Sequence, residues 1–231
     1  MFVSYISEAA LTAVSLAYPM QNLMIAVATG TGVGVNALLS RNLGEKNYSM
    51  ANRVAGNAIF LGLVSYVVFA LLGLLGSRFY FSVQVEDPNI IALGHDYLSI
   101  VTILSIGCFG QVLLSRLLQS TGKTFYSMVI QMVGAGLNLV LDPIMIFGLL
   151  GFPKMGVAGA ALATVISQLA GTALGIYYNL RKNPEIQFSL STLRPSKPVI
   201  SRIYGVGIPS ILLQTVSSVL IFGLNQILVA F

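Results

Sequence analysis

The stretch SMVIQMVGAGLNLVLDPIMIFGLL, residues 127–150, decides the fold class of this chain. It is longer than the roughly 20 apolar residues that cross a bilayer. Its single charge is Asp142, with Asn138 one helical turn earlier and Pro143 directly after it. Moving an Asp to the centre of a membrane helix costs roughly 2.5–3.5 kcal/mol on insertion scales. A carboxylate in such a segment is therefore expected to have a function.

The rest of the chain has the composition of a membrane protein. Of its 231 residues, 56% are hydrophobic and 8% are charged, whereas roughly 25% are charged in soluble domains. Six apolar stretches are long enough to span a bilayer. They are Leu11–Ser40, Val54–Gly76, Tyr97–Ser115, Thr124–Gly151, Met155–Leu180 and Val206–Phe231. The prediction is an all-α, polytopic membrane helix bundle with six complete spans.

Both ends of the sequence suggest a portion of something longer. Residues 1–6 are apolar but too short to span a bilayer, and the polar pair Ser7 and Glu8 follows them. We interpret them as the tail of a helix whose beginning is missing. Phe231 lies inside an apolar stretch, so we expect further chain beyond it as well.

The basic residues predict the orientation in the membrane. Ten Lys or Arg lie in three loops, near residues 41–53, 116–123 and 181–202, and the alternate loops hold only Arg78 and Lys154. By the positive-inside rule the three basic loops are cytoplasmic, and we expect a multi-pass protein of the plasma membrane, in contact with the lipid bilayer. No segment combines basic and aromatic residues along one exposed face, so no nucleic-acid partner is expected.

Enzymatic and metal chemistry find little support. Cys108 is the single cysteine, which excludes an intramolecular disulfide and a thiolate metal cluster; we expect a packed thiol. The single histidine, His95, is interpreted as a solvated residue at an outer helix end. Because no paired acid and base and no set of metal ligands is present, we expect neither an enzyme nor a cofactor.

Polar residues in the segment around Asp142 share one helix face, at steps of three and four residues. They are Gln131, Gly134, Asn138 and Asp142. Pro143 has no N–H, so the carbonyl of Leu139 loses its helix partner and a bend is expected there. Carboxylate, amide and carbonyl oxygens together suit a proton or a hard cation, so Na⁺ could bind at Asp142 and Asn138.

The next predicted helix carries two stripes. Gly159, Ala163, Ser167, Gly171 and Gly175 form a small-residue face that allows close helix packing. Ala160, Thr164, Gln168 and Thr172 lie one residue along. The second stripe places Thr164 where it could face Asp142.

Further polar or helix-breaking residues are predicted to line a cavity or a moving joint, as in a transporter interior, and those in the first and last of the six spans are predicted to interrupt these helices. They are Pro19, Gln21, Asn22, Pro143, Gln168 and Gln214, together with the glycine-rich run at residues 29–34. For the uncharged side chains, hydrogen bonding between helices is the alternative interpretation.

Five motifs resemble those of the multidrug and toxic compound extrusion (MATE) transporters, and the resemblance covers essentially the whole chain. They are AVSLAYP at 13–19, GVGVNALLSR at 32–41, LGEKN at 43–47, NLVLDPIMIFG at 138–148 and MGVAGAALAT at 155–164. The resemblance implies a protein of twelve helices in two six-helix lobes. It also implies a secondary antiporter that exports drugs and organic cations in exchange for H⁺ or Na⁺.

On this resemblance the six spans are helices 2–7. Residues 1–203 are then the N-terminal lobe with a truncated first helix and a cytoplasmic linker, and residues 204–231 begin the C-terminal lobe. The implied cation site comprises Asn138, Asp142 and Thr164, with an Asp of helix 1 upstream of Met1. We expect the chain alone to be inactive unless another chain supplies the missing lobe.

Two alternatives stay open. A lipid-linked oligosaccharide flippase of the related superfamily would need several cationic residues for its diphosphate lipid, and no Lys or Arg lies in the middle of a predicted span. A non-transporting membrane module that assembles with a partner is the other.

Overall fold

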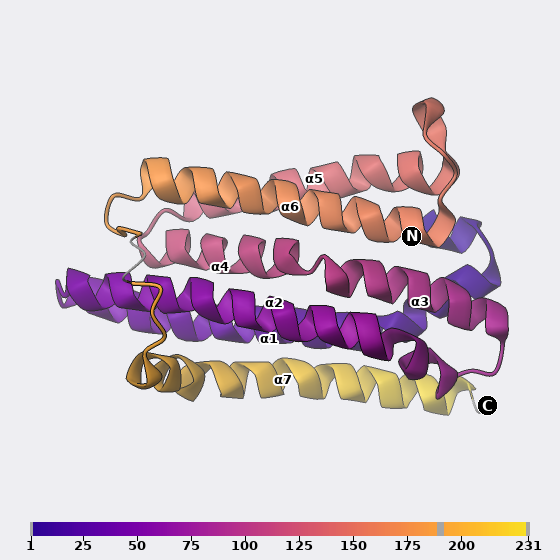
Figure 1. Cartoon of the computed structure of the whole chain (residues 1–231), viewed down its shortest axis with the longest axis horizontal. Helices are drawn as coiled ribbons and strands as arrows, with labels where there is room; N and C mark the ends of the chain where they lie inside the picture. Colours follow the sequence, from indigo (N-terminus) through magenta and orange to yellow (C-terminus); the bar gives the residue numbers. More distant parts are fainter. Residues whose placement is uncertain (1, 189–191, 230–231) are drawn as a thin grey trace.

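The computed structural model describes residues 2–188 and 192–229, and within these the chain is helical without strands (Figure 1). In chain order the elements are η1 (Phe2–Tyr5), α1 (Glu8–Gly44), α2 (Tyr48–Ser82), α3 (Pro88–Ile103), α4 (Ile106–Ser120), α5 (Thr124–Phe147), η2 (Leu149–Gly151), α6 (Gly156–Lys182) and α7 (Lys197–Val229). The predicted all-α membrane bundle is confirmed.

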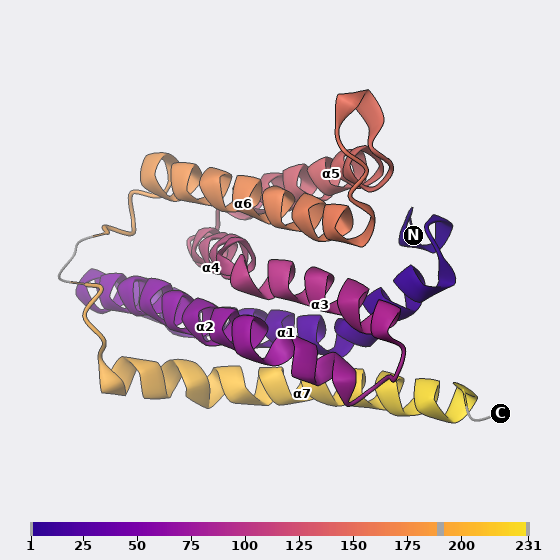
Figure 2. The same ribbon diagram turned by 45° about the vertical axis from the view of Figure 1, so that its right-hand side comes forward.

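The long helices run side by side, and their connections gather at two ends (Figures 1 and 2). The connections α1–α2, α4–α5 and α6–α7 lie at one end, at the left of Figure 1, which we call the basic end because they carry the predicted cytoplasmic loops. The connections α2–α3 and α5–α6 lie at the other, which we call the opposite end. The alternation of loops along the sequence therefore corresponds to two sides of the bundle.

The third predicted span differs from its expectation. Helices α1, α2, α5, α6 and α7 are each long and apolar enough to cross a membrane, whereas α3 and α4 form one broken span bent by 43°. The break falls at residues 104–105, inside the predicted Tyr97–Ser115 segment. Hydroxyl groups compete for the backbone on both sides of it. Thr102 donates to the carbonyl of Leu98 at 2.6 Å, and Thr172 of α6 donates to that of Gly107 at 2.8 Å.

Helix α1 is continuous through Pro19 and the glycine-rich run, so the expected interruption there is wrong. The glycines instead allow the backbone of α7 to approach that of α1. A Cβ added at Gly30 would lie 2.9 Å from the carbonyl oxygen of Gly207. A Cβ at Gly34 would overlap the carbonyl of Ile203. The glycine-rich run of α1 is therefore a close packing contact with α7.

Helix α7 begins at Lys197, earlier than the expected start of its span at Val206. Residue 204, where the second lobe is predicted to begin, therefore lies inside this helix. The described part of α7 packs mainly on α1. The division into lobes stays a prediction.

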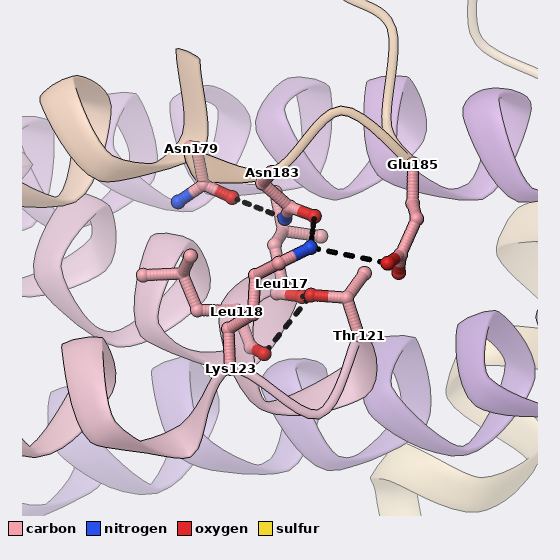
Figure 3. A network of polar contacts seen from close by, with 7 residues as sticks. All are labelled: Leu117, Leu118, Thr121, Lys123, Asn179, Asn183 and Glu185. Carbon is pink, nitrogen blue, oxygen red and sulfur yellow. Dashed lines mark hydrogen bonds and ion pairs between the residues drawn. The ribbon is translucent and has the colours of Figure 1, made fainter. Parts of the chain in front are cut away.

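Polar side chains fasten the α4–α5 connection to α6 at the basic end (Figure 3). Lys123 Nζ donates to Asn183 Oδ1 at 3.3 Å and pairs with Glu185 at 3.1 Å. Asn183 Nδ2 donates to Asn179 Oδ1 at 3.1 Å, and Asn179 Nδ2 donates to the carbonyl of Leu114 in α4 at 3.0 Å. Both asparagines are 1% exposed, so the chain of bonds runs through the interior.

The α6–α7 connection is fastened in a similar way to the start of α2. Asn57 is fully buried, and its Oδ1 accepts the backbone N–H of Ser196 at 2.9 Å. Asn52 Oδ1 accepts the backbone N–H of Gln187 at 2.9 Å. A Cβ at Gly56, between these two asparagines, would overlap the backbone of Thr192. The connection therefore lies directly on α2.

Candidate functional site

The structure brings Asn138, Asp142 and Thr164 together, as the helical spacing predicted. Asn138 Nδ2 lies 3.3 Å from Asp142 Oδ1 and 3.3 Å from Thr164 Oγ1. The first two side chains come from α5 and the third from α6. All three are half-buried. One amide group thus links a membrane carboxylate to the neighbouring helix.

Close packing of α5 and α6 sets this geometry. The small-residue face of α6 is buried along its whole length, which confirms its predicted packing role; it comprises Gly159, Ala163, Ser167, Gly171 and Gly175. At Gly159 an added Cβ would crowd the carbonyl of Met145 in α5. Thr164 Oγ1 donates to the carbonyl of Ala160 at 3.0 Å. Its lone pairs are therefore left to accept the amide of Asn138.

The hydrogen bonds around Asp142 bear on which cation, a proton or Na⁺, its carboxylate can bind. Within the described residues, Asp142 accepts one hydrogen bond, and no carboxylate or basic side chain pairs with it. A proton can bind the carboxylate without moving Asn138. A Na⁺ ion needs oxygen ligands, so the amide would have to rotate and present its oxygen. Groups of three or more His, Cys, Asp or Glu that could hold a metal are not found in the described residues.

Asp142 lies within the last two turns of α5, toward the opposite end of the bundle. The helix continues through Pro143 to Phe147 and ends at Gly148, whose φ of 74° is left-handed. Glycine adopts this conformation at little cost, and it is a common helix terminator. A bend at Pro143 stays a prediction.

The predicted cavity and hinge residues lie in separate places. Pro19 lines an apolar cleft of about 610 Å³ between α1, α2, α3 and α7. Gln21 accepts a hydrogen bond from the Tyr97 hydroxyl at 3.1 Å, which joins α1 to α3. Asn22 and Gln214 are half-buried. Pro19 and Gln21 therefore lie on α1, in contact with helices other than α5.

Gln168 does not join Thr164 at the carboxylate. Its Cβ lies against Gly107 of α4, close enough that a Cβ there would be 3.0 Å away. Its Oε1 is buried without a hydrogen-bond partner among the described residues. Within the second stripe of α6, Thr164 therefore contacts α5, whereas Gln168 contacts α4 just after the break.

His95 is not a solvated residue at a helix end. It lies within α3, is half-buried, and its Nδ1 is 2.7 Å from Oγ of Ser77 in α2. Ser77 is 1% exposed. The expectation failed because α3 begins at Pro88 and not near residue 97. Cys108, in contrast, is 4% exposed, which confirms the packed thiol.

Arg116 is a residue whose place sequence reasoning missed. We expected it in a cytoplasmic loop, but α4 continues to Ser120 and the arginine side chain lines a polar pocket between helices. The steps of four residues from Gln111 through Ser115 to Gln119 could have indicated a polar face on this segment. The pocket is separate from the Asp142 site.

The sequence profile described as MatE matches residues 1–144, more than half of the chain. The chain belongs to the MatE family. A member of similar sequence, the multidrug export protein MepA of Staphylococcus aureus strain MRSA252, is 27% identical over 214 residues, which are 92% of this chain and 47% of MepA. The chain thus spans about half the length of the curated relatives it matches.

Solved MATE structures share the fold. The inward-facing conformation of a multidrug resistance MATE transporter of the MOP superfamily superposes with a TM-score of 0.88 at 28% identity, covering 96% of this chain and 50% of that one. The outward-facing conformation gives 0.90 at 28% identity, covering 97% and 49%. The MatE chain is therefore a multi-pass membrane protein, and its helix arrangement matches both conformations closely.

Proposed function

We propose that this chain forms part of a secondary antiporter that exports drugs and organic cations in exchange for H⁺ or Na⁺. The observation that carries the proposal is the Asn138, Asp142 and Thr164 cluster, in which Asn138 bonds a membrane carboxylate of its own helix and a hydroxyl of the next helix. Ionisable groups inside a membrane are costly and mark ion pathways. The MatE relatives are named as export proteins and transporters, so no enzymatic role is proposed.

In the proposed mechanism, cation binding neutralises Asp142. The neutral side chain attracts the amide of Asn138 less strongly, so the hydrogen bond between these two turns of α5 weakens. Pro143 is the next residue, and α5 can bend there because one backbone hydrogen bond is already absent. The coupling ion thereby favours the conformation that binds substrate less tightly.

The orientation of Asn138 supports H⁺ over Na⁺ as the coupling ion. Thr164 Oγ1 donates to a backbone carbonyl, so it accepts from Asn138, and the same amide nitrogen faces Asp142. Protonation of Asp142 keeps this arrangement. Export that persists in sodium-free medium under an imposed pH gradient would support this choice, and strict dependence on sodium would overturn it.

The apolar cleft that Pro19 lines is the proposed substrate region. Its volume of about 610 Å³ falls within the range of roughly 300–1,000 Å³ typical of drug-sized ligands. Its lining is mostly apolar, with Ser77, Gln84 and Thr102 among the polar exceptions. Such a surface suits hydrophobic organic cations of varied shape.

Alternating access needs two lobes that move against each other. Because the chain spans about half of its relatives, we propose that a second lobe, on the same or another polypeptide, completes the transporter. We propose that the basic end faces the cytoplasm, which the positive-inside rule supports, and that the protein lies in the plasma membrane.

The test is export of a fluorescent organic cation from cells that express this chain, or a form extended at both ends from the genomic locus. We expect export by the extended form and at least a hundredfold slower export when Asp142→Asn removes the titratable group. Asp96→Asn, an exposed carboxylate of α3, is the matched control and should export normally.

Full export by the Asp142→Asn variant would refute the proposed coupling role. If neither form exports although both insert correctly in the membrane, the flippase or the non-transporting module becomes the better interpretation.

A further inference from the structure

A second polar site lies toward the basic end, in a pocket of about 280 Å³ between α1, α4 and α5. All but one of its lining side chains are polar. The polar ones are Thr29, Gln111, Ser115, Arg116, Gln119 and Gln131. None of the seven Asp and Glu residues of the chain lines it. The pocket therefore combines hydrogen-bond donors with one positive charge.

The position of Arg116 is fixed on two sides. Its aliphatic stem lies on α1, because a Cβ at Gly32 would be 2.8 Å from Arg116 Cγ. Its Nη1 donates to Gln119 Oε1 at 3.0 Å, and Gln119 Nε2 donates to the buried Ser127 Oγ at 2.8 Å. Arginines near helix ends usually extend to the membrane surface. Arg116 is instead half-buried and held beside the pocket.

Hydrogen-bond donors of Arg116 and Ser115 in this pocket have no acceptor among the described residues. A guanidinium has five N–H donors, and Arg116 uses one of them within the described chain. The ion pairs among the described residues are Arg41–Glu45 and Lys123–Glu185. Within this part of the chain, therefore, no carboxylate neutralises Arg116. Ser115 is 4% exposed, and its Oγ has no described hydrogen-bond partner. Buried polar groups without partners are costly, and a ligand with acceptor oxygens would satisfy both side chains.

We propose that this pocket binds an anionic oxygen group, a carboxylate or a phosphate, with Arg116 and Ser115 as its donors. The planar guanidinium binds either group through two parallel hydrogen bonds. The volume lies below the range for whole drug-sized ligands, so the pocket holds the charged group and a few attached atoms. A soluble organic acid and the headgroup of an anionic phospholipid present the same oxygens. The inference concerns binding alone and does not rest on the proposed export.

The experiment is calorimetric titration of the purified chain in neutral detergent micelles with two probes, salicylate and a short-chain phosphatidylglycerol. We expect at least one to bind, more weakly at high salt because screening weakens ionic attraction. Arg116→Gln should lower the affinity by about tenfold to a hundredfold. Arg116→Lys keeps the positive charge but cannot form the two parallel hydrogen bonds of the guanidinium, so the loss of affinity should be smaller. Ser115→Ala should lose about threefold.

Arg181→Gln removes an exposed arginine at the end of α6 and should bind like the wild type. Thermal unfolding of each variant shows whether it is folded; if Arg116→Gln is not, Arg116→Lys and Ser115→Ala carry the test. Binding of neither probe by the wild type would overturn the proposal, as would wild-type affinity in the folded variants. Tighter binding of salicylate assigns the site to soluble acids, and tighter binding of the lipid assigns it to headgroups. Export is not measured, so failure here leaves the transport proposal unaffected.

Discussion

The two ends of the bundle are held together differently. At the basic end, buried asparagines join helices and connections through hydrogen bonds: Asn179 in the network of Figure 3, and Asn57 at the α6–α7 connection. At the opposite end, the Tyr97 hydroxyl bonds Gln21 beside an apolar cleft of about 610 Å³. Residues that line such a cleft have fewer packing partners, and regions of low contact density open at lower free energy. We therefore expect helix movement mainly at the opposite end, with the basic end as its fixed base.

Two glycines of α2 test this contrast most strongly, because they lie at the two ends of one helix. Gly56→Ala places a Cβ against the backbone of Thr192, which cannot move aside as a side chain could. We expect a loss of about 1–3 kcal/mol of unfolding free energy from overpacking. At Gly76 nothing lies within 4 Å, so Gly76→Ala should stabilise by up to about 1 kcal/mol through helix propensity. Thermal unfolding in detergent, followed by circular dichroism, measures both.

Equal melting temperatures for the two glycine variants would contradict the close contact of the α6–α7 connection with α2. The comparison needs no functional assay, so it is independent of the transport proposal.

A polar pair sharpens the comparison with a smaller expected difference between the two ends. Asn179→Ala removes a hydrogen bond to the carbonyl of Leu114 and leaves the buried amide of Asn183 without this partner, which should cost about 1–3 kcal/mol. Tyr97→Phe removes one hydroxyl that bonds Gln21, and should cost about 0.5–1.5 kcal/mol. Chemical unfolding in mixed micelles gives both values. A larger loss for Tyr97→Phe would reverse our view of which end is fixed.

The smallest effect is expected from the ion pair of the basic end. Glu185→Gln removes the partner of Lys123, whose side chain is 22% exposed, while that of Glu185 is 42% exposed. Exposed pairs contribute at most about 1 kcal/mol, and salt screens them. The melting temperature should fall slightly at low salt and match the wild type at high salt. A salt-independent loss would indicate that Glu185 acts through packing.

The clustering of Asn138, Asp142 and Thr164 was predictable because these residues lie on two consecutive helices. The spacing of Asn138 and Asp142 places them on one face, and a short connection makes the next helix an adjacent, antiparallel neighbour. To predict that Thr164 lies beside them, only the register of α6 against α5 had to be known. The structure agrees with that expectation, because the amide of Asn138 donates to both Asp142 and Thr164.

Other features depend on contacts between helices distant in the sequence, and these could not be derived from periodicity. Gln168 contacts α4 because α6 crosses the break at residues 104–105. Arg116 was assigned to a loop because basic residues near helix ends usually report topology, but its surroundings come from α1 and α5. The glycine-rich run suggested an interrupted helix, whereas it serves the approach of α7.

The burial of Cys108 has a practical consequence for following this protein in motion. It is the single thiol in the sequence and is 4% exposed, on the first turn of α4. A cysteine introduced at an exposed position, such as Gly44 of the basic end or Ser82 of the opposite end, would be labelled selectively without replacing the native residue. Paired spin labels at such positions could then report distances between the two ends in a lipid bilayer.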